Sequence, residues 1–216
     1  MRQVTALPQP RQPERRERAG VRPARATDEA AAAALMYSSA GGMYDRFMGG
    51  RDQALRVLRR AFATTGTNAS AEVVTVAELD GRVAAILAAF PVEETVPRAE
   101  AFLRLTLRAL PPWRWPSALW LYYSGARAAP HPPVRALYVD ALATDPGLRR
   151  RGAARALLRE AERRAAELRL PAVALDTSLD NHPARSLYLS EGFEELAYRP
   201  ARRGLPGFVA LVKQLR

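Results

Sequence analysis

Residues 137 to 154 read LYVDALATDPGLRRRGAA, and this stretch decides the fold. Its first part belongs to a run with strand character at residues 135 to 144. We expect an arginine-rich helix at residues 147 to 170, because leucines and alanines recur on one stripe, and Pro171 stops it. A buried strand at residues 172 to 177 follows at once. The order strand, helix, strand predicts a crossover at the centre of an α/β sandwich with a partly parallel sheet.

The junction between the first strand and the helix has the features of a phosphate site. The first turn of a helix leaves backbone N–H groups unpaired and carries partial positive charge, so an anion can rest on it. Small residues allow a pyrophosphate to approach the backbone closely, and arginines supply opposite charge. This string alone is weak evidence for a phosphate site, because a basic helix start that binds no ligand has the same sequence pattern. The residues are Arg149, Arg150, Arg151, Gly152, Ala153 and Ala154.

A second string lies downstream, where residues 181 to 193 read NHPARSLYLSEGF. It resembles the second cofactor motif of the GNAT superfamily of acetyl-CoA-dependent N-acetyltransferases, in which an asparagine precedes a small residue, a tyrosine and a Gly-Phe pair. The upstream string at residues 142 to 154 resembles the first motif of the same family. The positions that match in the second string are Asn181, Ala184, Tyr188, Gly192 and Phe193.

This resemblance implies a binding mode for acetyl-CoA as co-substrate. It assigns strand backbone to the pantetheine arm, the loop before the helix to the pyrophosphate, and the asparagine to the cofactor. It also puts a tyrosine near the sulfur. One position departs from the commonest pattern, because Ala154 replaces a frequent glycine, which the family accepts. The implied cofactor-binding residues are Leu142, Ala143, Thr144, Arg149, Arg150, Arg151, Gly152, Ala153, Ala154, Asn181, Ala184 and Tyr188.

Acetyl transfer to an amine needs a neutral nitrogen, a stabilised carbonyl oxygen and a proton for the leaving thiolate. Tyr188 can supply that proton, because a phenol and a thiol both have pKa values above 7 in water. Its alternative role is a core aromatic. Asp140 and Tyr138 share one strand face, at positions where some family members place proton acceptors. A carboxylate beside an apolar cleft would have a raised pKa and could take a proton through water, although Asp140 is equally compatible with a solvated or structurally paired acid.

The rest of the chain predicts further strands and helices around this centre. Asp80-Gly81 joins two alternating runs and is the best hairpin signal in the sequence. Thr27 is expected to cap an alanine-rich helix. The glycine-bounded aromatic segment at residues 41 to 50 could line a site. The remaining expectations are strands at 21–25, 72–79, 82–90, 193–198 and 208–212, and helices at 51–63 and 183–191.

Residues 97 to 127 are expected to form helical pieces interrupted by prolines, and they hold the tryptophans Trp113, Trp115 and Trp120. Such a cluster more often belongs to a core, while an acceptor wall and a dimer surface are the alternatives. The resemblance implies a GNAT-like three-layer α/β fold, in which helices flank a central mixed, partly parallel, twisted sheet. We expect one domain at residues 20 to 216, preceded by a flexible basic tail at residues 1 to 19.

Composition excludes several classes of chemistry. The chain has no cysteine, which removes thiolate metal sites and a cysteine nucleophile. His131 and His182 lack metal-ligand spacing, so no metal is expected. The net charge of +11 comes from a chain with 32 arginines and one lysine. This preference for arginine over lysine indicates the codon bias of a GC-rich genome more than a nucleic-acid-binding surface. No apolar run could span a bilayer, and the N-terminus lacks a hydrophobic signal core, so the expected location is the cytoplasm.

The sequence therefore predicts an acetyl-CoA-dependent N-acetyltransferase that acts by direct attack of the amine in a ternary complex. The acceptor, a small-molecule or peptide amine, is not identified, and a homodimer is open. Glu93, Glu94 and Asp45 could help to recruit a cationic amine. Two other functions stay as alternatives. One is a non-catalytic acetyl-CoA sensor or interaction module, and the other is an arginine-rich nucleic-acid-associated protein.

Overall fold

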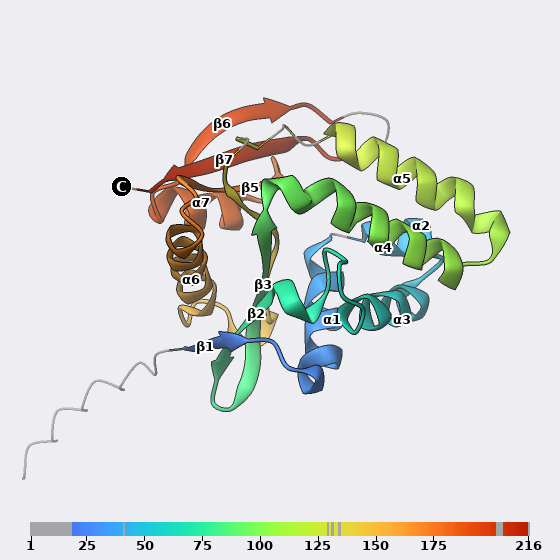
Figure 1. Cartoon of the computed structure of the whole chain (residues 1–216), viewed down its shortest axis with the longest axis horizontal. Helices are drawn as coiled ribbons and strands as arrows, with labels where there is room; N and C mark the ends of the chain where they lie inside the picture. The colour runs from blue at the N-terminus through green and yellow to red at the C-terminus, as the bar shows by residue number, and fades with distance from the viewer. Residues whose placement is uncertain are drawn as a thin grey trace, which may run out of the picture.

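A computed structural model describes residues 19–40, 42–128, 130, 132–133, 135–201 and 205–215 of the chain (Figure 1). Residues 1 to 18 of the predicted basic tail lie outside the described residues, as does His131. Among the described helices, none is long and apolar enough to cross a membrane.

A seven-stranded sheet forms the middle of the molecule, in the order β1-β2-β3-β4-β5-β7-β6. Every neighbouring pair is antiparallel except β4 and β5, which run parallel because α6 returns the chain over one face of the sheet. The predicted mixed sheet is therefore confirmed, with one parallel pair at its centre. The strands are β1 (Gly20–Pro23), β2 (Val74–Leu79), β3 (Arg82–Pro91), β4 (Leu137–Thr144), β5 (Ala172–Ser178), β6 (Glu194–Arg199) and β7 (Phe208–Gln214).

Helices cover the sheet on both faces and give three layers (Figure 1). On one face α6 packs across β2, β3, β4 and β5, while α1 lies on β3 and β4 from the other face and is backed by α3. The helices are α1 (Glu29–Ser39), α2 (Met43–Met48), α3 (Arg51–Phe62), α4 (Thr95–Ala109), α5 (Trp115–Ala128), α6 (Ala153–Glu167) and α7 (His182–Ser190).

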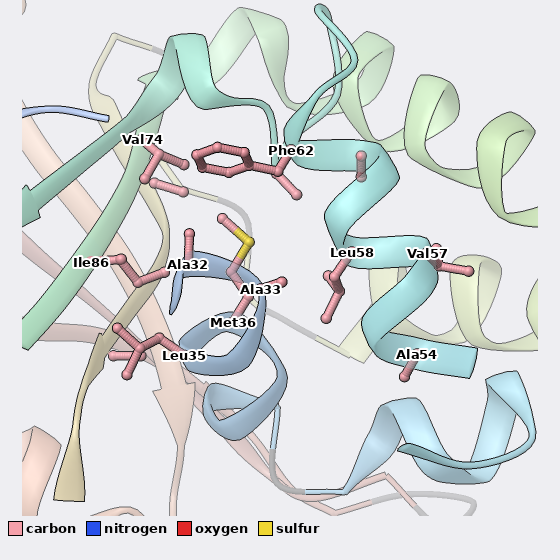
Figure 2. Close-up of a cluster of buried hydrophobic side chains, with 14 of the residues drawn as sticks. Ala32, Ala33, Leu35, Met36, Ala54, Val57, Leu58, Phe62, Val74 and Ile86 are labelled. Atoms are coloured by element: carbon pink, nitrogen blue, oxygen red, sulfur yellow. The ribbon is translucent and has the colours of Figure 1, made fainter. Parts of the chain in front are cut away.

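Two apolar cores hold the layers together, one on each face of the sheet. Figure 2 shows the first, where Phe62 of α3 and Met36 of α1 point toward Val74 of β2. The second core joins Leu157 and Leu158 of α6 to the other face of the sheet, and both leucines are fully buried. Buried side chains alternate along β3, with Ile86 in the first core and Leu87 in the second. This one strand therefore takes part in the packing on both faces of the sheet.

Most predicted elements are confirmed, and the differences have local causes. The hairpin turns at Asp80-Gly81, where both residues have positive φ. Thr27 is not an N-cap, because residues Ala26–Asp28 form a 3₁₀ turn and the helix begins after them. The helix predicted from residue 147 begins at Ala153, since Pro146–Leu148 form a separate 3₁₀ turn. The aromatic segment at residues 41 to 50 contains the short helix α2.

The tryptophan segment is mostly not core, so that interpretation is wrong. Trp113 is 78% exposed and Trp115 is 42% exposed. The indole N–H of Trp115 donates to the carbonyls of Leu107 and Leu110, at 2.9 and 3.2 Å, and so satisfies the C-terminal end of α4. Trp120 alone packs inward, stacked on Phe47 with 5.3 Å between ring centroids.

The packing of α6 on the sheet gives a stability prediction. Leu158→Ala removes a fully buried side chain and leaves a cavity, so we expect the free energy of unfolding to fall by about 2 to 5 kcal/mol. Leu168→Ala, at the exposed end of the same helix, is the matched control and should change it by less than about 0.5 kcal/mol. Urea unfolding measures both, and equal losses would show that α6 does not pack as described.

Candidate active site

The central parallel pair opens at mid-strand. On their outer sides β4 stays paired with β3 as far as Thr144, and β5 with β7 as far as Ser178. Between them, the strands part after three residues. The inner backbone groups of residues 141 to 144 therefore have no strand partner on β5 and are available to hydrogen-bond an extended ligand. The three pairs formed are Leu137 with Val173, Tyr138 with Ala174, and Val139 with Leu175.

A β-bulge at Asp140 accompanies this parting. Ala88 pairs with Ala141 and Ala89 with Val139, so Asp140 is the extra residue on β4. The insertion reverses the side-chain alternation beyond it, and Leu142 consequently packs in the same core as Val139. Bulges bend a strand and redirect the side chain of the extra residue. The bulge therefore explains why β4 turns away from β5 and carries a carboxylate at the turning point.

The loop after β4 is shaped to hold an anion. The carboxylate of Asp145 accepts a hydrogen bond from the N–H of Gly147 at 2.8 Å and fixes the turn. Arg150 and Gly152 have left-handed backbone, with φ values of 62° and 87°. Among the described residues no backbone carbonyl accepts the N–H groups of residues 149 to 155. Successive free N–H groups in such a loop form an anion-binding nest at the N-terminus of α6.

The loop arginines divide into two kinds. Arg151 donates twice to Asp80, at 3.0 Å each, and so ties the loop to the β2–β3 turn. Arg149 and Arg150 make no ion pair with any described residue, so their charges are available to a ligand. Ala153 and Ala154 follow directly as the first residues of α6. Arg151 therefore contributes its backbone to the loop while its side chain has a structural partner.

Helix α7 begins beside the end of β5 and carries the second motif. Asn181 caps it, because its side-chain oxygen accepts from the N–H of Ala184 at 3.4 Å. The side-chain amide of Asn181 also donates to the hydroxyl of Thr177 at 3.1 Å. This cap holds the helix start against β5, and a contact of Asn181 with the cofactor stays a prediction.

Tyr188 points from α7 into the core beneath the parted strands. Its ring is 6% exposed and packs on Phe193, with 5.9 Å between centroids. Among the described residues its hydroxyl has no hydrogen-bond partner. Burial raises the pKa of Tyr188 well above its usual value, and the charge of Asp176 adds to the rise. The phenol is therefore protonated at neutral pH, and its O–H group has no acceptor among the described residues.

Asp176 on β5 is the residue that the sequence interpretation missed. It follows Leu175, the last residue of β5 that pairs with β4. The hydroxyl of Tyr138 donates a short hydrogen bond to its carboxylate. Burial raises the pKa of Asp176, and the Tyr138 hydrogen bond opposes the rise. A single acid at the end of the otherwise apolar run 172 to 175 was the sequence signal for it.

Asp140 faces the same region from β4. Its side chain is exposed at the surface, yet the protein packed around the carboxylate partly desolvates it and raises its pKa to about 7. The charge of Asp176 adds to this rise, and a hydrogen bond donated by the amide of Asn68 at 3.1 Å opposes it. Such a carboxylate is half ionised near neutral pH and can accept a proton there. Asp140 and Tyr138 therefore lie together, as the strand pattern predicted.

Two of the other predicted acids, Glu94 and Asp45, have partners of their own. Glu94 accepts from Arg98 at 2.6 Å, and Asp45 accepts from the hydroxyl of Tyr37. Tyr44, next to Asp45 on α2, instead faces Asp140, whose charge adds to the raised pKa that burial gives its phenol. Within the described part of the chain no three His, Asp or Glu side chains form a group that could hold a metal ion.

Comparisons with known proteins bear on the family and the fold. The model of the acetyltransferase (GNAT) family matches residues 45–193. A search of curated protein sequences found no match. The fold is similar to a solved N-acetyltransferase from Staphylococcus aureus Mu50, with 19% identity and a TM-score of 0.70 over 90% of this chain and 100% of that one.

Two further solved structures share the fold. A structure described as an acetyltransferase has 20% identity and a TM-score of 0.68, over 91% of this chain and 99% of that one. A chain of the NatC complex bound to Gag peptide and CoA has 15% identity and a TM-score of 0.51, over 93% of this chain and 100% of that one. At these identities the likeness establishes the fold alone.

The left-handed loop gives a binding prediction with CoA as the probe. In Gly152→Ala the backbone should relax from φ +87°, and restoring it on binding costs about 1 to 2 kcal/mol, or about tenfold in affinity. Gly66→Ala is the matched control, since Gly66 also has positive φ and open space but lies between α3 and β2. Calorimetric titration should show weaker CoA binding for Gly152→Ala alone. Equal affinity in both variants would remove the loop from the CoA site.

Proposed function

The chain belongs to the GNAT acetyltransferase family, and on this basis we propose that it transfers an acetyl group from acetyl-CoA to a primary amine. One observation carries the proposal. The unpaired inner edge of β4 leads directly into the nest of free N–H groups at the start of α6, and Tyr188 presents an uncommitted hydroxyl near the same opening. We treat residues 20 to 216 as one catalytic domain.

Acetyl-CoA would lie along β4 and end at the loop. The backbone of residues 142 to 144 would hydrogen-bond the pantetheine arm, because these groups lack a partner on β5. The loop from 149 to 154 would hold the pyrophosphate through its N–H groups, with Arg149 and Arg150 supplying charge. Ala184, directly after the cap of α7, would lie against the cofactor. The backbone N–H groups and the arginines can donate hydrogen bonds to phosphates and to amide carbonyls, and CoA carries both.

The transfer would proceed by direct attack in a ternary complex. An ammonium group loses one proton to Asp140, and the freed nitrogen bonds to the thioester carbon while the carbon–sulfur bond breaks. The nitrogen then releases its second proton to solvent, and the sulfur takes a proton from Tyr188, which is reprotonated as Asp140 gives up the proton that it accepted. One proton leaves to solvent for each amide formed, so charge and atoms balance. Tyr138 holds Asp176 beside this path and is a positioning residue in this scheme.

The acceptor would be a small molecule or a peptide that carries an amine. In this proposal the acceptor would lie on the α1 and α2 side of the parted strands, where Tyr44 lies close enough for the charge of Asp140 to act on it and Asn68 donates to Asp140. The peptide and CoA bound in the NatC complex belong to that protein, and they motivate peptides as one class to test here.

Removal of the Tyr188 hydroxyl tests the proposal. Tyr188→Phe keeps the ring packing on Phe193 but deletes the acid, so the rate of amine-dependent thiol release from acetyl-CoA should fall by about 100-fold. Tyr198→Phe is the matched control, because Tyr198 is 72% exposed on β6, and its rate should equal that of wild type. Wild-type protein that binds acetyl-CoA but releases no thiol with any amine would instead favour a sensor.

The raised pKa of Asp140 predicts a pH dependence. As a base, Asp140 works when ionised, so kcat/KM should rise through about pH 7 and then level off, and Asp140→Asn should abolish this rise.

The raised pKa of Asp140 also predicts that the stability of the protein falls as pH rises. A carboxyl whose pKa is raised by folding stabilises the protein below its unfolded pKa and loses this contribution as pH rises through the folded pKa. Asp140→Asn should therefore raise the melting temperature at pH 8 relative to wild type, with little change at pH 4.

A further inference from the structure

Residues 101 to 139 contain no aspartate or glutamate, although the chain has 22 acids among its 216 residues. The same stretch holds all three tryptophans, and the proposed acetyl transfer uses none of them. It covers most of the hairpin of α4 and α5, which pack against each other. Residues 110 to 116, here called the α4–α5 turn, join the two helices at the outer edge of the molecule, at the right of Figure 1.

The α4–α5 turn holds one tryptophan out in water on a braced backbone. Trp113 is 78% exposed, more than any other large apolar side chain among the described residues. The N–H of Arg114 donates to the carbonyl of Pro111 at 2.9 Å and closes the turn, and proline rings restrict the backbone around it. Trp115, whose indole N–H is bonded to carbonyls of α4, fixes the other side. The exposure of Trp113 is therefore a property of a well-supported turn.

Arginines lie beside the turn. Arg104 and Arg108 are four residues apart on α4 and both are exposed, so they share the outer face of that helix. Arg56 of α3 joins them, because it donates to the side-chain oxygen of Gln53 at 3.2 Å, and the amide of Gln53 donates to the carbonyl of Ala109 at 2.8 Å. Within the described part of the chain, neither Arg56 nor Arg108 forms an ion pair.

Acids offset only part of this charge. Glu100 lies 3.5 Å from Arg104, and Asp52 precedes Gln53 on α3. Against that one acid α3 carries four arginines, and after Glu100 the next acid in the chain is Asp140. The surface around the turn is therefore positive.

An apolar hollow opens beside the turn. It has a volume of about 350 Å³ and is lined by Phe47, Pro116, Ser117 and Trp120. Of these described lining residues only Ser117 is polar, and none is charged. The surface thus combines an exposed indole, an apolar hollow and arginines, which are the features of segments that lie in the interfacial region of a membrane.

We propose that the α4–α5 turn docks on the surface of an anionic lipid bilayer, with Trp113 between headgroups and acyl chains and the arginines on lipid phosphates. Tryptophan favours this depth, because its ring is apolar and its N–H is polar. Each arginine close to an anionic leaflet is attracted by the negative surface potential. The inference does not depend on the proposed acetyl transfer, since the turn contains none of the residues assigned to CoA or to the reaction.

The chemistry of the turn favours a bilayer over two other partners. A second copy that used the same surface would bring arginines against arginines, because a two-fold contact repeats one patch on both sides. A single-stranded nucleic acid would match the arginines and could stack on Trp113, but its phosphates would gain nothing from the apolar hollow. A bilayer presents anionic and apolar groups at one surface, so it matches all three features.

Flotation of the full chain with lipid vesicles tests the docking. Vesicles of phosphatidylcholine with about one-third phosphatidylglycerol should bind the protein, and vesicles of phosphatidylcholine alone should bind it at least about tenfold more weakly. Trp113→Ala should lower the affinity for the mixed vesicles about tenfold, because it removes the inserted ring. Tyr198→Ala is the matched control, since Tyr198 is 72% exposed on β6, outside the hairpin, and should leave the affinity unchanged. Arg108→Gln should weaken binding to the mixed vesicles about fivefold.

Brominated acyl chains locate the inserted ring. They should quench the tryptophan fluorescence of the bound wild-type protein, and Trp113→Phe should lose most of this quenching while it keeps its binding, because phenylalanine also enters the interface. Absent vesicle binding, or equal affinity of wild type and Trp113→Ala for the mixed vesicles, would overturn the inference. Binding of oligothymidylate or a dimer in light scattering, either one lost in Trp113→Ala and without vesicle binding, would instead assign the turn to nucleic acid or to a second copy.

Discussion

The candidate site depends on one constraint, which is that β4 and β5 can pair over three residues and no further. The extra residue Asp140 turns β4 away, while β3 and β7 keep both strands extended on their outer sides. Opening a sheet at its centre leaves backbone groups unpaired, a cost that an elongated ligand with amide groups can offset. Tyr188 lies in the core on one face of the sheet, close enough to Asp176 of β5 for that charge to raise the pKa of its phenol.

The two ends of this opening differ in the charge of the groups around them. The loop at the start of α6 gathers free N–H groups and the charges of Arg149 and Arg150, and it suits an anion. The acids at the parting point have no cation beside them among the described residues, and they suit a positive group. A donor with phosphates and an acceptor with an ammonium would therefore enter with opposite charges and meet between the two ends.

The sequence alone predicted the strand, loop and helix of the proposed cofactor half, because their signals are local. A strand, a glycine-containing loop and a helix N-terminus occupy consecutive residues from 137 to 154, and Asn181 and Tyr188 lie on one short helix, so spacing fixes their relation. The hairpin at Asp80-Gly81 was predictable for the same reason, since two residues set the turn. The start of α6 was misplaced because proline and left-handed residues delay the helix in a way that apolar periodicity does not record.

Only the tertiary structure shows which residues lie together in the proposed acceptor half. Asp176 is 36 residues from Asp140 in the chain, and Asn68 comes from a loop before β2, so no local pattern links them. The bulge that places Asp140 where β4 leaves β5 appears only in the register between β3 and β4. The tryptophans show the same limit, since Trp113 is exposed by the packing of α4 and α5 and not by its own hydropathy. Local backbone conformation depends on neighbouring residues, whereas burial and the interactions between charges depend on which distant segments pack together.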